Sequence, residues 1–409
     1  MNTMNGPLAG IRVLDLGQYI AGPSAGQTLA DLGADVLKVE SLGGDQARTI
    51  GTFGEAMVQA YNRDKRSIAL DLRQEEARGI LHRLIAESDV LVQNFRHGSA
   101  ERLGIGPDEL GRRYPRLVHG SVTGFGTNGP SSARPGLDIA AQAEFGLMHA
   151  TGEADGEPQR LGLPIADVTA ANALATGILA ALYQRNSTGR GAHVQTSLME
   201  ATLSMQASNW GEYALTGQAP RRKGNGQALV APGADVVDVA DGKIVLSAYT
   251  SEKWSALCNL IERPDMLDDP RFVDNPARVA HRTELLAALS EAFGAMTRRE
   301  AVERLLSAQI VCGAIRSFDD LAEDKDVSAS EILVDVAADG GDSYTSPGLA
   351  FTLDGRRRTT SVAAPGVGQH SVDVLRELGY TDAAVSDLLD SRVVGASVPE
   401  RQHSERLPS

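Results

Sequence analysis

Residues 161–182 read LGLPIADVTAANALATGILAAL and predict the central helix of the protein. A turn signal, Gly162 with Pro164, precedes a long run of small and apolar residues, which predicts a helix buried on all sides. Its small residues would let another backbone pack closely. Asp167 stands at the N-terminus, where the helix dipole and free N–H groups favour an anion. An aspartate there is most often an N-cap, and Thr169 could cap as well, so the stretch alone leaves the role of Asp167 open.

The composition bounds the class of protein. At 409 residues the chain is long enough for two domains, and a hydrophobic content of 42% suffices for a well-filled core. The formal charge of −14 argues against nucleic acid or an anionic membrane surface as a partner, although a local basic pocket could still bind a small anion. Cys258 and Cys312 stand in apolar contexts, which indicates buried free thiols in a reducing cytosol. The histidines show no metal-binding spacing, so we expect no metal site.

The chain carries no recognisable targeting segment. Its first residues, MNTMNGPLAG, lack the basic and apolar regions of a signal peptide. Asp, Asn or Gly interrupts the apolar stretches before they reach membrane-spanning length. We therefore expect a soluble, cytoplasmic protein with no membrane partner.

The N-terminal half alternates short apolar strands with helices. A strand at residues 11–16 leads to a helix that begins near Pro23 and ends at Gly33, and a second strand follows at 35–40. This βαβ unit implies a parallel sheet covered by helices. The pattern continues with strands at 67–71, 89–93 and 117–122 and helices at 75–87 and 107–113. The first loop reads GQYIAGPS, so the GxGxxG dinucleotide fingerprint is absent, although the helix start could still bind an anion.

Basic residues recur on the loops of this half. Ligands of open α/β sheets bind beyond the carboxyl ends of the strands, where we place loops 17–22, 62–66, 94–98 and 123–130. These loops carry Lys65, Arg66 and Arg96, with Arg102 slightly further on. Basic side chains on loops are most often merely solvated, but their recurrence at strand ends predicts an anionic ligand.

The second half contains a smaller domain. A strand at 192–197 and a helix from 198 complete the first domain, and the composition changes to Gly, Pro and basic residues at 216–227. Asp241-Gly242 then predicts a hairpin. Its strands are 234–238 and 243–248, and helices 251–261, 282–293 and 299–308 with a strand at 310–315 make this part α+β. Residues 331–336 start the return. The expected division is therefore 1–222 with 331–394 for the large domain, 223–330 for the small domain and a mobile tail at 395–409.

Seven segments, in order along the chain, carry a family resemblance. They are PLAGIRVLDLGQYIAGPSAGQTLADLGADVLKVE, YNRDKRSIALDL, VLVQNFRHGSAERLGIG, PRLVHGSVTGFGTNGP, ADVTAANALATGILAAL, RNSTGRGAHVQTSLMEA and DPRFVDNPARVAHR. As an ordered set they resemble the class III CoA-transferase family, also called CaiB/BaiF, over nearly the whole chain. The resemblance implies a Rossmann-like large domain with a parallel sheet, a smaller α+β domain, and a homodimer of two interlocked rings.

The resemblance also implies the site. Asp167, the aspartate of ADVTA, would be the catalytic carboxylate. Coenzyme A, as the acyl-CoA substrate, would contact Tyr19, Ile20, Ala21, Lys65, Arg66, Asn94, Phe95, Arg96, Arg102, Arg134 and Gly136. An oxyanion-stabilising glycine loop would comprise Gly224, Gly226 and Gln227, with 124–126 or 232–233 as alternatives and an ordinary linker as the plain interpretation. The partners would be an acyl-CoA donor, a small carboxylic acid acceptor and a second copy of the chain.

The implied reaction is an exchange of CoA between two acids. Asp167 would attack the thioester, giving a mixed anhydride and then an aspartyl-CoA thioester that the acceptor carboxylate attacks. Two departures from the family matter. Ser41-Leu42 replace an Arg-Pro pair, so Arg48 or Arg102 would have to supply a cation. Leu137 replaces the proton-shuttling histidine of the racemase branch, which argues against an acyl-CoA isomerase or racemase. A CoA-binding paralogue without activity is the other alternative.

Overall fold

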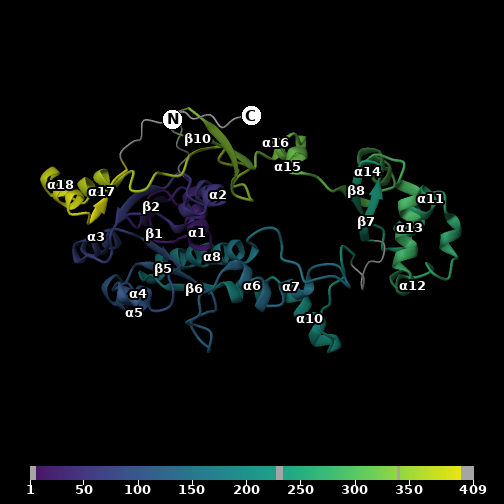
Figure 1. Ribbon diagram of the computed structural model, residues 1–409, viewed down its shortest axis with the longest axis horizontal. Coiled ribbons are helices and arrows are strands. Elements are labelled where there is room, and N and C mark those ends of the chain that lie inside the picture. Colours follow the sequence, from purple (N-terminus) through teal and green to yellow (C-terminus); the bar gives the residue numbers. More distant parts are fainter. Residues whose placement is uncertain (1–5, 227–233, 339–340, 398–409) are drawn as a thin grey trace. The chain divides into compact units, whose positions relative to one another are not determined.

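The computed structural model describes residues 6–226, 234–338 and 341–397 (Figure 1). The chain divides into two compact units, Met1–Phe145 with Gly162–Ala207 and Ser328–Ser409, and Gly146–Leu161 with Ser208–Val327. This division differs from the predicted one because residues 146–161 and 208–222 belong to the second unit. The expected tail also begins too early, since Gly395 is still paired in a strand. Residues 398–409 lie outside the described part.

The first unit is built on a parallel sheet, as predicted. Its order is β13-β3-β2-β1-β4-β5-β6, and all neighbours are parallel except the antiparallel edge strand β13. The strands are β1 (Arg12–Asp15), β2 (Asp35–Glu40), β3 (Arg66–Leu70), β4 (Val90–Gln93), β5 (Val118–Thr123), β6 (His193–Ser197) and β13 (Val394–Gly395). The order 3-2-1-4-5-6 is that of the Rossmann-type doubly wound sheet. Such a sheet binds ligands at the carboxyl ends of its strands.

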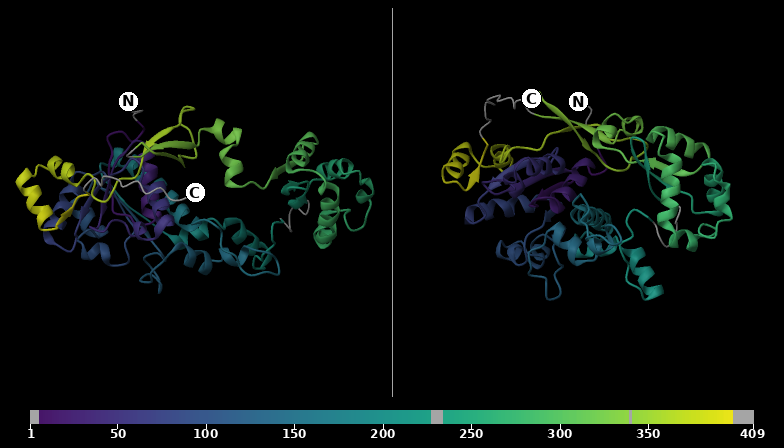
Figure 2. Two further views of the ribbon diagram at one scale, coloured as in Figure 1. Left: turned by 45° about the horizontal axis from the view of Figure 1, so that its top comes forward. Right: turned by 45° about the vertical axis from the view of Figure 1, so that its right-hand side comes forward.

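Helices cover both faces of this sheet, because successive strand residues point to opposite sides. Val13 joins a core with α1 and α8, whereas the next residue, Leu14, joins a core with α3, α17 and α18. Figure 2 shows α17 and α18 beside the N-terminal sheet. The helices of this unit are α1 (Ala21–Asp31), α2 (Gly51–Tyr61), α3 (Glu75–Ala86), α4 (Ser99–Arg102), α5 (Pro107–Arg113), α6 (Asp138–Glu144), α8 (Ile165–Thr188), α9 (Leu198–Ser204), α17 (Ser371–Glu377) and α18 (Asp382–Asp390). A short sheet of β10 (Leu333–Ala337), β11 (Ser343–Pro347) and β12 (Thr360–Val362) completes it.

Helix α8 is the predicted core helix, but the expectation that it is buried on all sides was wrong, since Asn172, Thr176 and Tyr183 are exposed on one face. It packs against α1, β5, β6 and α9, and a Cβ on Gly177 would collide with Val194 of β6, so the small residues do permit close packing. Gly189 ends the helix in the left-handed conformation that suits glycine. Within the described residues α8 alone is long and apolar enough to cross a membrane, so the expectation that no stretch reaches that length was wrong. Its buried side chains pack on the sheet, as those of a globular core helix do.

The second unit is α+β, as predicted. The hairpin of β7 (Ala234–Val239) and β8 (Gly242–Ser247) turns at Asp241-Gly242, and β9 (Val311–Ala314) extends it as an antiparallel sheet. Trp254, Leu257 and Phe293 lie in its separate core. The helices are α7 (Leu147–Ala150), α10 (Ala207–Thr216), α11 (Ser251–Leu260), α12 (Asn275–Ala280), α13 (Arg282–Phe293), α14 (Arg298–Ser307) and α15 (Phe318–Ala322), with α16 (Lys325–Ser330) at the boundary. Cys258 is buried and Cys312 half-buried, and both are free thiols.

Two stacked histidines make the first unit sensitive to acid. His119 of β5 lies opposite His193 of β6 with ring centroids 4.7 Å apart, and among the described residues neither buried nitrogen of His119 has a hydrogen-bond partner. Burial, together with the neighbouring His193, lowers the pKa of His119 to about 3. Below about pH 6.5 His119 is therefore protonated in the unfolded chain but stays neutral in the folded chain. The free energy of unfolding thus decreases as the pH drops below that value.

We expect His119→Leu to remove most of this acid sensitivity. For the wild type, the His119 contribution between pH 7 and pH 5 amounts to a loss of about 2 kcal/mol in the free energy of unfolding. Urea unfolding at both pH values measures it, with the exposed His97→Leu as the matched control. Equal pH dependence in the His119 variant and the wild type would contradict the assignment.

Candidate active site

The N-terminus of α8 holds Asp167 without using it as a cap. Pro164 occupies the cap position and provides no side-chain acceptor, and Asp167 lies half-buried in the first turn. Burial, and then the charge of Asp138, raises the pKa of Asp167 to about 7. Thr169, the other candidate cap, donates its hydroxyl to the sulfur of Met205 instead. A carboxylate that is hard to ionise and not engaged as a cap suits a chemical role.

Asp138, at the start of α6, takes the free amides of α8. Its Oδ1 accepts hydrogen bonds from the backbone N–H of Ala166 at 2.7 Å and of Asp167 at 3.4 Å. Its Oδ2 accepts from Gln142 Nε2 at 2.6 Å. Asp138 thus holds the start of α8 in place of a local cap. Sequence reasoning missed this role because the contact spans 28 residues, and the only local signal is the i, i+4 spacing of Asp138 and Gln142.

The loop after β1 packs beside the same helix turn. Ile20 is buried in a small apolar cluster, against which Tyr19, Tyr61 and Val168, the neighbour of Asp167, also pack. Burial, and then the charge of Asp167, raises the pKa of the Tyr61 phenol. The predicted ligand loop is therefore brought to the predicted catalytic carboxylate within one unit. Tyr61 is a site residue that the sequence did not single out.

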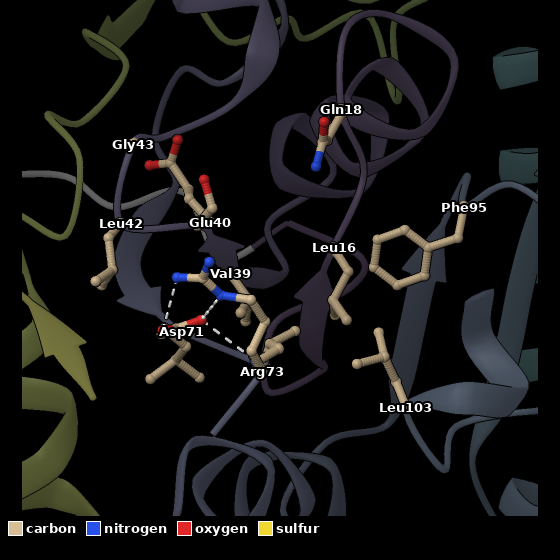
Figure 3. Close-up of a pocket in the computed structure, with 13 residues that line it drawn as sticks. Leu16, Gln18, Val39, Glu40, Leu42, Gly43, Asp71, Arg73, Phe95 and Leu103 are labelled. Atoms are coloured by element: carbon tan, nitrogen blue, oxygen red, sulfur yellow. Dashed lines mark hydrogen bonds and ion pairs between the residues drawn. The ribbon is translucent and has the colours of Figure 1, made fainter. Parts of the chain in front are cut away.

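A cavity of about 470 Å³ opens beyond the carboxyl ends of β1 to β4 (Figure 3). Such a place is where an α/β sheet binds its ligand. Arg73 supplies a cation at its wall, held against Asp71 at 2.7 Å, while its side chain remains 88% exposed. The lining consists of Leu16, Gln18, Val39, Glu40, Ser41, Leu42, Gly43, Leu70, Asp71, Leu72, Arg73, Phe95 and Leu103. Of the predicted CoA contacts, Phe95 is in this wall.

The placement of loop 62–66 was wrong, since it precedes β3 and so lies at the amino end of that strand. Lys65 is fully buried, and its ammonium group donates to Asp15 at 2.7 Å, Pro23 O at 2.8 Å and Asn62 Oδ1 at 3.0 Å. All three of its protons are used, which leaves none for a ligand. Arg66 pairs with Asp35 and Glu377. Both basic residues hold the fold together here instead of facing the cavity.

The remaining predicted CoA contacts lie in different environments, some exposed and some engaged within the protein. Arg96 is exposed beyond β4, and Arg102 donates to Ser99 at 2.7 Å. Arg134 is bonded by two hydrogen bonds to Glu144 and lies over the ring of Phe125. Gly136 crosses the backbone at Gly124 so closely that a Cβ on either would collide. Ala21 is buried as the first residue of α1.

Two predicted roles are taken up by contacts within the protein. Both atoms of the Asn94 amide bond the backbone of Gln18, at 2.9 and 2.8 Å. Arg48, a candidate for the missing cation, is engaged by Glu40 and by Pro365 O at 2.8 Å. Asn94 therefore fixes a loop, and Arg48 is not available to the cavity.

The predicted glycine loop lies in the second unit. Gly224 has a φ of +62° and donates its N–H to Gly152 O at 3.0 Å. A Cβ on Gly226 would crowd the Arg282–Asp235 ion pair. Gln227 and residues 232–233 lie outside the described residues. In the described ranges no three His, Cys, Asp or Glu side chains converge as a metal site would require.

Comparisons with known proteins identify the family. The family model described as CoA-transferase family III matches residues 8–371. The chain is 33% identical to a succinate–glutarate CoA-transferase of Agrobacterium fabrum (91% of this chain, 96% of the relative), and 33% identical to a succinyl-CoA:mesaconate CoA-transferase of Haloarcula hispanica (91% and 97%). An acetyl-CoA:oxalate CoA-transferase of Acetobacter aceti is 35% identical (80% and 86%). The crystal structure of a CaiB/BaiF family protein from Brucella suis superposes with a TM-score of 0.83 at 34% identity, covering 91% of this chain and all of that one. The chain therefore belongs to CoA-transferase family III and is an enzyme that acts on CoA thioesters.

Proposed function

We propose that this enzyme moves CoA from an acyl-CoA to a free carboxylic acid, with Asp167 as the nucleophile. The observation that carries the proposal is the half-buried Asp167 carboxylate in the first turn of α8, with a pKa of about 7 and with the nearby amides taken by Asp138. A carboxylate of raised pKa is a better nucleophile than an ordinary aspartate and is still largely ionised above neutrality.

The proposed steps conserve atoms and charge. An oxygen of Asp167 attacks the thioester carbonyl, the C–S bond breaks, and CoA leaves as a thiolate, which gives a mixed anhydride. The thiolate attacks the aspartyl carbonyl of the anhydride and releases the donor acid, leaving an aspartyl-CoA thioester. The acceptor carboxylate expels the thiolate and forms a second anhydride. The thiolate then attacks the acceptor carbonyl, which releases the new acyl-CoA and restores Asp167. One thioester replaces another, so no external energy source is needed.

We place the nucleotide end of CoA in the cavity beyond β1 to β4. CoA carries several negative charges and an aromatic base, and this cavity offers the Arg73 guanidinium and the Phe95 ring. With Ser41-Leu42 in place of the family's Arg-Pro and Arg48 bound to Glu40, Arg73 is the cation best placed to take over. The relatives' names pair CoA with succinate, glutarate, mesaconate and oxalate, so we propose a small dicarboxylic acid as acceptor.

A mass-spectrometric exchange assay tests the function. The protein is mixed with succinyl-, acetyl- or propionyl-CoA and a panel of free mono- and dicarboxylic acids, and new acyl-CoA masses are sought. We expect new thioesters with dicarboxylates, and no exchange at the C2 position in deuterated water, since Leu137 cannot carry a proton. CoA binding without any exchange across the panel would instead favour a non-catalytic paralogue.

We also propose the interlocked homodimer. Large apolar side chains stand exposed on and beside the core helix, among them Leu163 at 51% and Tyr183 at 82%. We propose that a second copy covers these side chains, since large contiguous exposed apolar patches mark surfaces that another protein covers. Interlocked rings would bury far more area than an ordinary interface, so light scattering after gel filtration is expected to give twice the chain mass of 43.2 kDa even at nanomolar concentration. A stable monomer would refute this architecture.

A further inference from the structure

The turn between β1 and α1 is held in a conformation that it would not adopt alone. Tyr19 has a φ of +62°, in the left-handed region that residues with a Cβ avoid. The turn is also crowded, since a Cβ on Gly17 would lie 2.8 Å from Asp15 Oδ1 and from Pro23 Cδ. A strained turn of this kind persists only where its surroundings fix it.

Asn94, directly after β4, holds part of this strained turn in place. Its Oδ1 accepts the N–H of Gln18 at 2.9 Å, and its Nδ2 donates to the C=O of Gln18 at 2.8 Å. This pair of bonds satisfies the whole backbone of Gln18. Only the Gln18 side chain is left for the cavity, whose wall it joins in Figure 3.

The other part is a buried ion pair beneath the turn. Lys38 Nζ and Asp45 Oδ2 are 2.9 Å apart, and both side chains are 1% exposed. Lys38 Nζ also donates to the C=O of Gly17 at 2.8 Å, and Asp45 Oδ1 accepts the N–H of Tyr19 at 3.1 Å. The ion pair thus hydrogen-bonds the backbone of Gly17 and Tyr19, the two neighbours of Gln18, which Asn94 binds.

We propose that Asn94, Lys38 and Asp45 are positioning residues for the acyl-CoA substrate, which act through the backbone of residues 17–19. Asp45 Oδ1 also accepts the N–H of Ala47 at 2.9 Å. The inference rests on the proposed function, because the turn borders both the cavity and the cluster next to Asp167. Asn94 was expected to contact CoA itself, and its saturated amide assigns it this indirect role instead. Loosening the turn should weaken CoA binding and leave the affinity for the acceptor acid unchanged.

Two variants break the contacts in different ways. Asn94→Ala removes both bonds to Gln18 and leaves every buried charge paired. Lys38→Met combined with Asp45→Leu removes the ion pair as a unit, which avoids the unpaired buried charge that a single substitution would create. Lys38→Met with Asp45→Asn retains an acceptor for Tyr19 N–H and serves as the conservative rescue. The matched control is Arg63→Met with Asp31→Leu, a buried pair at 3.2 Å that does not touch the turn.

The readouts are the dissociation constant of free CoA by titration calorimetry and the separate KM values for acyl-CoA and acid. We expect the CoA dissociation constant and the acyl-CoA KM to rise about tenfold in both breaking variants, with partial recovery in the rescue, since each loses two hydrogen bonds to residues 17–19. The acid KM and the control should change less than about twofold. Unchanged CoA binding in both breaking variants, or an equal rise in both KM values, overturns the inference alone. A wild type that binds no CoA overturns it together with the proposed function.

Discussion

Replacing Asp167 with asparagine is expected to abolish CoA transfer and, at the same time, to make the protein more stable. The amide cannot form the mixed anhydride, and removal of a covalent nucleophile commonly lowers kcat by three orders of magnitude or more. The exchange assay measures this loss for wild type and variant side by side. CoA binding should persist, because Asp167 is not among the residues that line the proposed CoA cavity.

The gain in stability follows from the pKa of the same carboxyl. In the unfolded chain Asp167 ionises near pH 3.8, whereas in the folded chain its pKa is about 7, with burial as the main cause. Stability therefore falls as the pH rises between these values, and above neutrality the folded protein carries the full cost of the buried charge. Asp167→Asn removes that cost, so its Tm should exceed that of the wild type by several degrees at about pH 8 and by nothing below about pH 4.

The exposed Asp155→Asn is the control, because it removes the same charge without removing a buried one. It should leave both the exchange rate and the Tm close to the wild-type values. An Asp167→Asn protein that exchanges CoA normally would show that the aspartate only shapes the helix, and the mechanism would have to be abandoned.

Much of this fold follows from local pattern. The limits of β2, α5 and α13 coincide with the predicted ones, because Gly33, Pro107 and the apolar periodicity mark them locally. The parallel sheet follows from the βαβ alternation. The edge strand β13 does not, since a two-residue antiparallel partner for β3 from the far C-terminus has no sequence signature.

The site was harder to predict because its contacts join distant segments. Loop 62–66 precedes the strand that the sequence predicted at 67–71, so its placement at a carboxyl end did not follow from that prediction, and the burial of Lys65 against Asp15 depends on a contact between distant segments. Lys38 and Asp45 are buried although both are charged. Their pairing depends on how β2 and the loop after it pack against the turn that follows β1. Arg73 was overlooked because its role depends on the shape of a cavity, which no local pattern encodes.

The division into units shows the same limit. The change of composition at 216–227 marks a region rich in Gly and basic residues, which we interpreted as the crossing point. The structure assigns the segment Gly146–Leu161 and the chain from Ser208 onward to the second unit, because Arg222 donates to the backbone of His149, Glu153 and Gly156. A single arginine that donates to three carbonyl groups holds these two segments together in the second unit, whereas the prediction placed both in the large domain.

Asp138→Asn is expected to shift the acid limb of the pH–rate profile to lower pH and to lower the plateau rate by about tenfold or more. The asparagine side chain of this variant can still accept the N–H of Ala166, so the start of α8 should stay in place, whereas the negative charge beside Asp167 is lost. The pKa of Asp167 then falls from about 7, although burial, the larger cause, keeps it above its ordinary value. A less basic carboxylate ionises earlier but attacks a thioester more slowly.

Measuring kcat/KM for acyl-CoA from pH 5 to pH 9 separates this electrostatic role from a purely structural one. Asp138→Ala is the companion variant, because it removes the charge and also the acceptor for α8. It should show the same shift of the acid limb together with a loss of about 1 kcal/mol in the free energy of unfolding, the usual cost of a lost helix cap. A structural role alone would lower the rate of Asp138→Ala at every pH and leave the midpoint of Asp138→Asn where the wild type has it. A midpoint that moves down in both variants would mean that Asp138 holds the helix and also keeps its neighbouring carboxylate basic enough to attack.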